Sequence, residues 1–225
     1  MIQIITVYGG ILLTAMGQTL ILALTGLFFA CIIGLVMGLL GTVENKVCNI
    51  IETVFVDVIR GVPMIVLAYF IFFGVPYLWN NILGIGGLTL SALVAGSICL
   101  ALNCGAYMAE IIRAGIQSVD VGQMEAARSL GMPYWTSMRK VVLPQAIRTM
   151  IPTIINQFII TLKDTSILSV IGFPELVNTA KNVVATTFMA FQVWAIVAVM
   201  YLIVILLLSK LAKVLERRLN RGRKR

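Results

Sequence analysis

Five long stretches of mostly apolar residues dominate this sequence, and each is close to the length that a helix needs to cross a bilayer. A transmembrane helix needs about 20 such residues, whereas a strand of a membrane barrel needs about 10. Only 12% of the residues are charged, against about a quarter in a soluble domain. Since lipid tolerates only helices and closed barrels, the sequence predicts one all-α membrane domain over residues 1–225. The predicted spans are residues 19–41, 60–83, 88–113, 150–169 and 186–208.

The distribution of Lys and Arg predicts the orientation of these spans. With five spans, all but two of the 17 basic residues fall in segments on one side, and the exceptions are Lys163 and Lys181. Because cytoplasmic segments carry the excess of basic residues, we expect the C-terminus in the cytoplasm and the N-terminus outside. The basic tail from Lys210 onward is expected to continue the last helix and to contact anionic headgroups, without binding nucleic acid. The uncharged, glycine-containing residues 1–18 favour an interfacial or external segment over a sixth span.

Two local patterns predict how the spans pack and bend. Small residues at four-residue spacing allow helices to approach closely. They occur in the first span at Gly26, Ala30, Gly34 and Gly38, and in the third at Ala101, Gly105 and Ala109. Pro63, just after Gly61, predicts a break near the cytoplasmic end of the second span, either along a transport pathway or as a bend needed only for packing.

The connection between the third and fourth predicted spans, residues 114–149, carries signals for a short capped helix. Asp120 is a favourable N-cap residue, and Gln123 stands in the capping-box position. Gly131 stands where a glycine would end the helix, and Pro133 can open the next one. Such a helix is too short to be stable alone, so we expect it to dock against another surface.

The same loop contains a spaced motif, which reads Glu125-Ala126-Ala127, three residues, Gly131, nine residues, Val141, one residue and Leu143-Pro144. This motif resembles the EAA loop of ABC importer permeases. Val141 stands where the family pattern has Ile. Residues 60–70, 103–116 and 162–176 are similar to the polar amino acid subfamily of these permeases, and the resemblance covers most of residues 17–210. It implies a bacterial inner-membrane permease with five spans per subunit.

The resemblance also implies partners and roles. The short helix would be the coupling helix, seated in a groove of a cytoplasmic ABC ATPase subunit. The residues implied in this coupling are Glu125, Ala126, Ala127, Arg128, Gly131, Leu143 and Pro144. A second permease subunit, identical or paralogous, an external substrate-binding protein and a polar amino acid substrate are implied as well. The sequence has no GxxxxGK[ST] loop and no His, so we expect ATP and Mg on the partner ATPase, and no metal site or catalytic residue in this chain.

Ionisable residues within the fourth predicted span indicate a substrate pathway. Lys163 lies eleven residues after Pro152, which is about 16 Å along a helix and near the middle of a ~30 Å hydrocarbon core. Lys163 and Asp164 would be costly there unless they are paired or face water. A zwitterionic amino acid offers a carboxylate for Lys163 and an ammonium for Asp164. Four other polar residues are expected to line the same pathway: Asn103, Tyr107, Thr165 and Ser166.

Other interpretations of these residues stay open. Lys163 and Asp164 could hold the helix near an external gate, or be satisfied within the bundle by Asn103, Tyr107 or Gln157. Glu110 and Arg113, three residues apart, are expected to form an ion pair on the surface of their helix. The main alternative function is a secondary transporter or channel that uses Lys163 and Asp164 as ion-linked groups. A membrane scaffold subunit is a third possibility.

Overall fold

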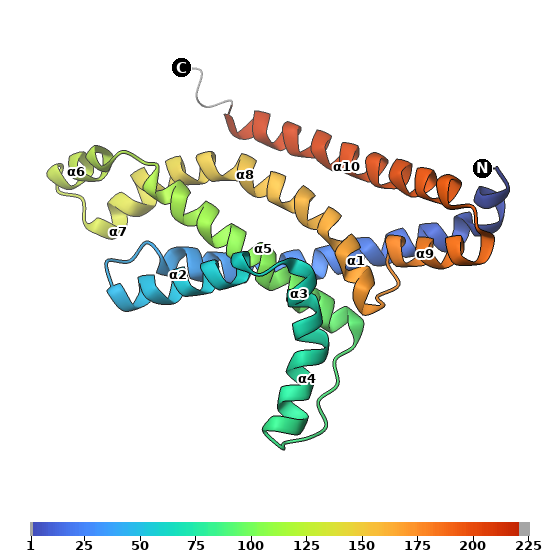
Figure 1. Cartoon of the computed structure of the whole chain (residues 1–225). Helices are drawn as coiled ribbons and strands as arrows, with labels where there is room; N and C mark the ends of the chain where they lie inside the picture. The colour runs from blue at the N-terminus through green and yellow to red at the C-terminus, as the bar shows by residue number, and fades with distance from the viewer. Residues whose placement is uncertain (1, 221–225) are drawn as a thin grey trace.

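A computed structural model of the chain describes residues 2–220, and the side chains of residues 4–214. Within this range the chain is an elongated bundle of helices (Figure 1). Five helices of the described part are long and apolar enough to cross a membrane. They are Ile4–Leu40, Met64–Ile82, Ala92–Gln117, Tyr134–Ile171 and Ala190–Val214. The predicted all-α bundle of about five spans is confirmed.

The helices, in chain order, are α1 (Ile2–Leu40), α2 (Lys46–Gly61), α3 (Met64–Tyr69), α4 (Val75–Tyr77), α5 (Ala92–Gln117), α6 (Val121–Ser129), α7 (Tyr134–Ser137), α8 (Leu143–Asp164), α9 (Leu176–Thr187) and α10 (Ala190–Asn220). Turns of other pitch continue several of them. The wider π-helical turns are Phe70–Gly74, Leu78–Ile82 and Met138–Val142, and the tighter 3-10 turn is Thr165–Ile171. As a result, Met64–Ile82 and Tyr134–Ile171 are each one continuous helical rod.

Proline explains two of the π-helical turns. Pro144 stands in the first turn of α8, directly after the turn Met138–Val142, and Pro76 is placed in the same way in α4 after Phe70–Gly74. A proline has no backbone N–H, and its ring clashes with the carbonyl four residues earlier in a regular helix. The wider turn accommodates the ring, so each rod continues through its proline without ending.

Residues 2–18 are the first part of the continuous helix α1, and their expected interfacial or external position stays a prediction. Side chains of this part are buried: Ile4, Leu12, Ala15 and Met16 pack with α9 and α10. Apolar contacts along one face therefore continue the helix through a region in which glycines had suggested an interruption.

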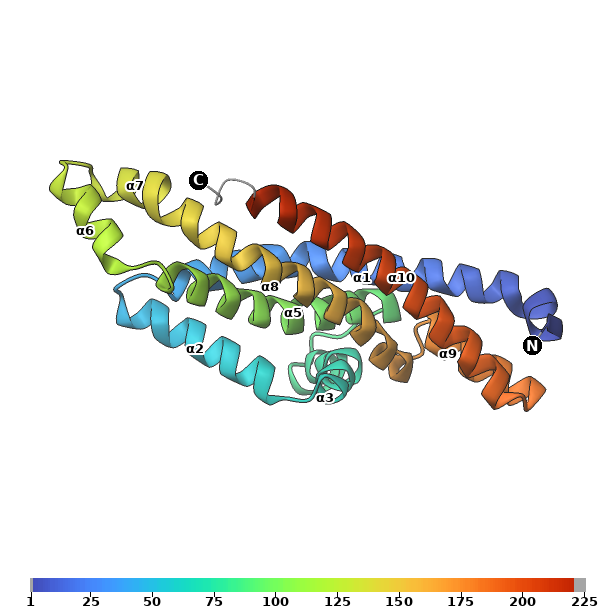
Figure 2. The ribbon, with the colours of Figure 1, turned by 90° about the horizontal axis from the view of Figure 1, so that it is seen from above.

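α2 is a helix that the span pattern did not predict. The side chain of Asn45 caps it by accepting a hydrogen bond of 2.8 Å from the backbone N–H of Val47. The helix ends at Gly61, and Pro63 follows in an extended conformation. The predicted break at Pro63 is confirmed, but Arg60 belongs to α2 and the second span begins after Pro63. α2 runs beside α1 and α5 (Figures 1 and 2).

The last span also begins later than predicted. Thr186 and Thr187 end α9, and Phe188 takes a left-handed conformation with φ of 57°. This conformation interrupts the helix, so the span starts at Ala190. The helix then continues to Asn220, as predicted for the basic tail, of which residues 221–225 lie outside the described part.

The crossing of α1 and α5 forms the centre of the bundle, and these two helices contact each other more extensively than any other pair in the described residues. A Cβ atom added to Gly34 would lie 2.4 Å from the Cβ of Met108. One added to Gly105 would lie 2.9 Å from the Cγ2 of Ile33. Ala30, between the two helices, is fully buried. The two predicted stripes of small residues therefore face each other, and the close approach requires them.

The other helices are arranged around this pair. α8 packs on α5, and α10 packs on α8 (Figures 1 and 2). The rod Met64–Ile82 runs across the direction of α1, as the two views show. α6 and α7 lie at one end of the bundle, and α9 lies at the other, beside the start of α1. The loop 114–149 and α9 are therefore at opposite ends of the molecule.

A buried polar cluster fastens α9 to α1. Glu175 is fully buried and caps α9, because its carboxylate accepts hydrogen bonds of 2.8 and 2.6 Å from the backbone N–H groups of Val177 and Asn178. Burial raises the pKa of Glu175, and the two backbone donors counteract part of that rise. The hydroxyl of Thr19 accepts a bond of 3.1 Å from the N–H of Leu176. The chain between the fourth and fifth spans is thereby held on α1.

We predict that Gly34→Ala destabilises the protein by about 1–3 kcal/mol, the usual cost of overpacking a tight contact. The added methyl group would lie 2.4 Å from Met108 and would push α1 away from α5. The measurement is the midpoint of thermal unfolding in detergent. Gly17→Ala is the matched control in the same helix, because a Cβ at Gly17 meets no atom within 4 Å. Equal midpoints for the two variants would contradict the packing role of Gly34.

Candidate functional site

A cavity of about 380 Å³, here called the inner cavity, lies between the end of α2, α5 and α8. Half of its lining residues are apolar, among them Met64, Ile160 and Ile167. Its polar and charged lining residues come from three helices and are Arg60, Asn103, Tyr107, Gln157 and Asp164. A concave apolar site with a few convergent polar groups is typical of small-molecule binding sites, whose volumes run from about 300 to 1,000 Å³.

The structure separates the two members of the predicted pair Lys163 and Asp164. Asp164 lines the inner cavity, together with Asn103 and Tyr107, as predicted. Lys163 does not line it and is exposed on another face of α8, since successive helical residues point about 100° apart. Arg60, not Lys163, provides the positive charge among the described residues that line the cavity.

The two predicted hydroxyl residues after Asp164 do not line the inner cavity either. Thr165 is buried, and its hydroxyl donates a bond of 2.7 Å to the carbonyl of Leu162. The hydroxyl of Ser166 donates a bond of 2.7 Å to the carbonyl of Lys163. Both hydroxyls thus bind the backbone of the preceding turn, where α8 passes into the 3-10 turn.

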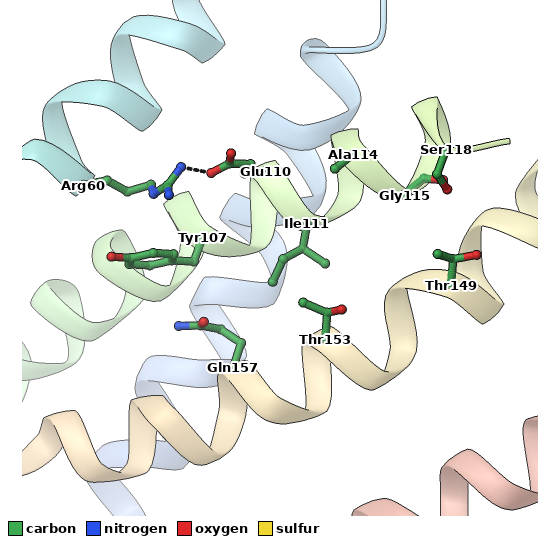
Figure 3. A pocket seen from close by; sticks show the side chains of 10 residues that line it. All are labelled: Arg60, Tyr107, Glu110, Ile111, Ala114, Gly115, Ser118, Thr149, Thr153 and Gln157. Carbon is green, nitrogen blue, oxygen red and sulfur yellow. Dashed lines mark hydrogen bonds and ion pairs between the residues drawn. The ribbon is translucent and has the colours of Figure 1, made fainter.

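Two side chains of α5 hold Arg60 at the edge of the inner cavity (Figure 3). Its guanidinium forms an ion pair with Glu110 and lies 4.8 Å from the centroid of the Tyr107 ring. The expected pairing of Glu110 with Arg113 is therefore wrong. Arg113 instead has its Nε 3.6 Å from a carboxylate oxygen of Glu52, a buried residue of α2. Both ion pairs connect α2 to α5, because these helices run side by side.

A second cavity, of about 500 Å³, lies next to the first on the side of the loop 114–149 and is here called the loop-side cavity. It lies between α5 and α8, and Figure 3 shows the side chains around it. Ser118 and Thr149, at the two ends of that loop, line its far part. Three residues line both cavities: Arg60, Tyr107 and Gln157.

The N-terminus of α6 has the predicted cap. The carboxylate of Asp120 accepts a bond of 2.6 Å from the backbone N–H of Gly122. The side chain of Gln123 does not form the bond that a capping box predicts. Its oxygen instead accepts a hydrogen bond of 3.3 Å from Nε2 of Gln145. Gln145 belongs to α8, so this bond connects the short helix to the fourth span.

The C-terminus of α6 has the predicted glycine cap. Gly131 takes a left-handed conformation with φ of 80°. Its N–H donates to the carbonyl of Arg128 at 2.9 Å, and the N–H of Met132 donates to the carbonyl of Ala127 at 3.2 Å. This pair of bonds is a Schellman motif, which ends a helix by satisfying its last carbonyls.

The residues of the EAA motif divide between an outward and an inward face of α6. Glu125, Ala126 and Arg128 are exposed. Ala127 is buried, on the face where α6 packs on α7 and the following π-helical turn. Ala127 therefore supports the loop from inside, and its neighbours form the exposed face of α6. The other motif residues, Leu143 and Pro144, begin α8 and are half-buried and exposed, respectively.

Comparison with known proteins decides the family. Residues 26–221 match the family described as binding-protein-dependent transport system inner membrane component. The chain belongs to this family. It is a multi-pass permease subunit of an ABC importer, as the EAA loop implied.

Relatives of this permease are similar over nearly their whole length. The glutamine transport system permease protein GlnP of Escherichia coli (strain K12) is 38% identical over 203 residues, which cover 90% of each chain. A putative glutamine transport system permease protein GlnP of Rickettsia typhi is 35% identical over 194 residues, 84% of this permease and 86% of the relative.

Solved structures agree with the fold of the permease. One, described as a crystal structure of an amino acid ABC transporter with histidines, has a TM-score of 0.85 and 38% identity, and the match covers 94% of this permease and 95% of that chain. An inward-facing structure of the MetNI methionine ABC transporter has a TM-score of 0.75 at 20% identity, over 94% of this permease and 97% of that chain. The second likeness supports the fold alone.

We predict that Gly131→Ala loosens α6, because a residue with a Cβ pays about 1–2 kcal/mol in the left-handed conformation. Amide hydrogen exchange across Val121–Met132 should then be about tenfold faster, in proportion to the lost free energy of the cap. Gly131→Asn is the matched control, since Asn tolerates this conformation better than Ala. Unchanged exchange in Gly131→Ala would show that the cap does not hold the helix.

Proposed function

We propose that this permease carries a polar amino acid through the inner cavity, as one half of a dimeric, ATP-driven importer. The observation that carries the proposal is the convergence of Arg60, Asp164 and Asn103 from three helices on one cavity. A zwitterion presents a carboxylate that suits the guanidinium and an ammonium that suits the carboxylate of Asp164. The names of the glutamine transport relatives support this substrate class, with glutamine as the first candidate.

The pathway that we propose for coupling runs along one helix. α6 would dock on a cytoplasmic ABC ATPase through its exposed residues, which include Glu125, Ala126 and Arg128. That ATPase would bind ATP and Mg. The rod Tyr134–Ile171 leads from the loop to the inner cavity, and Gln145 within it is bonded to α6. A displacement of α6 would therefore move Gln157 and Asp164 at the cavity.

The transport cycle that we propose is alternating access. An external binding protein would deliver the amino acid to a pair of permease subunits, identical or paralogous. The N-terminus would lie outside and the C-terminus in the cytoplasm, in agreement with the basic residues of the loop 114–149 and of the tail after Lys210. ATP-driven movement of the two α6 helices would then open the inner cavity to the cytoplasm.

Asp164→Asn is expected to lower ATP-driven uptake of L-glutamine by about tenfold or more, since it removes a charged partner of the ammonium while keeping the size of the side chain. The measurement is uptake by proteoliposomes that contain the permease, its ATPase and its binding protein. Lys163→Gln is the matched control, because Lys163 is the neighbouring charge outside the cavity. A larger loss in Lys163→Gln than in Asp164→Asn would contradict the proposed site, and normal uptake in Asp164→Asn would favour a scaffold subunit.

Gly131→Asp is expected to leave the protein inserted in the membrane and to uncouple it from its ATPase, because it adds a charge at the end of the docking helix. The measurements are co-purification of the ATPase and ATP-driven uptake. Gly131→Asn has the same size without the charge and should retain both. Normal association and uptake in Gly131→Asp would count against coupling through this loop. Uptake by vesicles that hold the chain without any ATPase would support the secondary transporter or channel.

A further inference from the structure

The boundary between the two cavities is formed by three side chains from three helices. Arg60 of α2, Tyr107 of α5 and Gln157 of α8 line both the inner cavity and the loop-side cavity. Asp164 lines only the inner cavity, and Thr153, which is drawn in Figure 3, lines only the loop-side cavity. A solute that moves from the inner cavity toward the loop 114–149 between α5 and α8 must pass these three side chains.

We propose that Arg60, Tyr107 and Gln157 form the gate between the inner cavity and the loop-side cavity, and that Glu110 is the positioning residue that keeps it closed. The ion pair with Glu110 draws the guanidinium of Arg60 across the space between α2 and α5. The Tyr107 ring lies under the guanidinium, 4.8 Å away, which adds a cation–π contact. The proposal rests on the proposed function only in taking the inner cavity as the place of the substrate.

The position of each residue in its helix suits a gate that opens in every transport cycle. Arg60 is in the last turn of α2, just before the break at Pro63, so it can move with α2 independently of the rod Met64–Ile82. Gln157 belongs to the rod Tyr134–Ile171, which begins at the coupling loop. A shift of that rod would withdraw Gln157 from Arg60 and Tyr107, and so open the boundary from the side of α8.

The two ion pairs between α2 and α5 differ in burial, and this difference indicates which pair can separate when the gate opens. The side chains of Arg60 and Glu110 are 35% and 38% exposed, and exposed ion pairs are weak. In the other pair, which lines neither cavity, Arg113 is 34% exposed but Glu52 is only 1% exposed. Separating that pair would leave the buried carboxylate of Glu52 without its cation, which is costly, so the Glu52 pair keeps α2 on α5 while the Arg60 pair can open.

The carboxylate of the substrate would bind the same guanidinium, that of Arg60. An arginine side chain has five donors, and Glu110 occupies one edge of the fork. The carboxylate of an amino acid in the inner cavity would bind the remaining donors of the guanidinium and share its positive charge with Glu110. Occupation of the inner cavity therefore weakens the closed gate, so that the gate opens more readily when a substrate is present.

The test measures how fast an impermeant thiol reagent reaches each cavity. Ile160→Cys reports the inner cavity and Thr153→Cys the loop-side cavity, since each lines one cavity only. Each is placed in the full permease–ATPase complex in inside-out vesicles without nucleotide or substrate, with a charged methanethiosulfonate as the probe. The native cysteines are first replaced by alanine, at Cys31, Cys48, Cys99 and Cys104.

Glu110→Gln should raise the reaction rate at Ile160→Cys about fivefold, the population shift expected from losing a partly exposed ion pair. The rate at Thr153→Cys should stay unchanged. Asp57→Asn, which neutralises an exposed carboxylate of α2 that lines neither cavity, should change neither rate. The swap of Arg60→Glu with Glu110→Arg should restore the slow rate, because it restores the pair.

Two results would overturn the gate. One is an equal rate at Ile160→Cys with and without Glu110→Gln, and the other is an equal rise at both reporter positions, which would indicate general loosening. Because the labelling needs no substrate, it can fail while the effect of Asp164→Asn on uptake persists. In the same way, the gate can be supported by labelling even if the substrate proves not to be an amino acid.

Discussion

The close contact of α1 and α5 determines where every other functional part of this permease lies. In a bilayer, helices gain little from burying apolar surface against each other, so association depends on close packing. Gly34 and Gly105 provide this packing, since neither has room for a Cβ. The opposite face of α5 carries Asn103, Tyr107 and Glu110. One helix therefore uses one face to hold the bundle together and the other to line the cavities.

The sequence predicts the features that depend on local pattern. Apolar length places the five spans, and the caps of α6 follow from Asp120 and Gly131, whose roles depend on backbone geometry within a few residues. The small-residue stripes predict the α1–α5 contact because the spacing on each helix is itself the signal. The EAA motif predicts the family in the same way, because all its residues lie in one stretch of the chain and their spacing can be read from the sequence.

The features that depend on distant parts of the chain could not be predicted. α2 is too short and too polar to resemble a span, so the sequence alone does not assign Arg60 to the substrate pathway, although residue 60 opens the predicted second span and the segment 60–70 that resembles the subfamily. Its partner Glu110 lies on α5 and is reached only because the two helices pack side by side. The i, i+3 rule for Glu110 and Arg113 describes an isolated helix, and here a neighbouring helix supplies stronger partners. Two signals point to Arg60: its place just before the Gly61–Pro63 break and its place in the segment 60–70 that resembles the subfamily.

The same reasoning explains why the cation of the site comes from α2. A helix that presents Asp164 to a cavity turns the adjacent Lys163 about 100° away, so these two neighbours cannot offer both charges to one ligand. In this cavity the opposite charges come from two helices. Here they are α8, which is continuous with the coupling loop, and α2, which is joined to the next span by the extended residues at Pro63. Relative movement of these two helices would change the distance between Arg60 and Asp164, so under the proposed function the transmission of force and the recognition of a zwitterion depend on the same pair of helices.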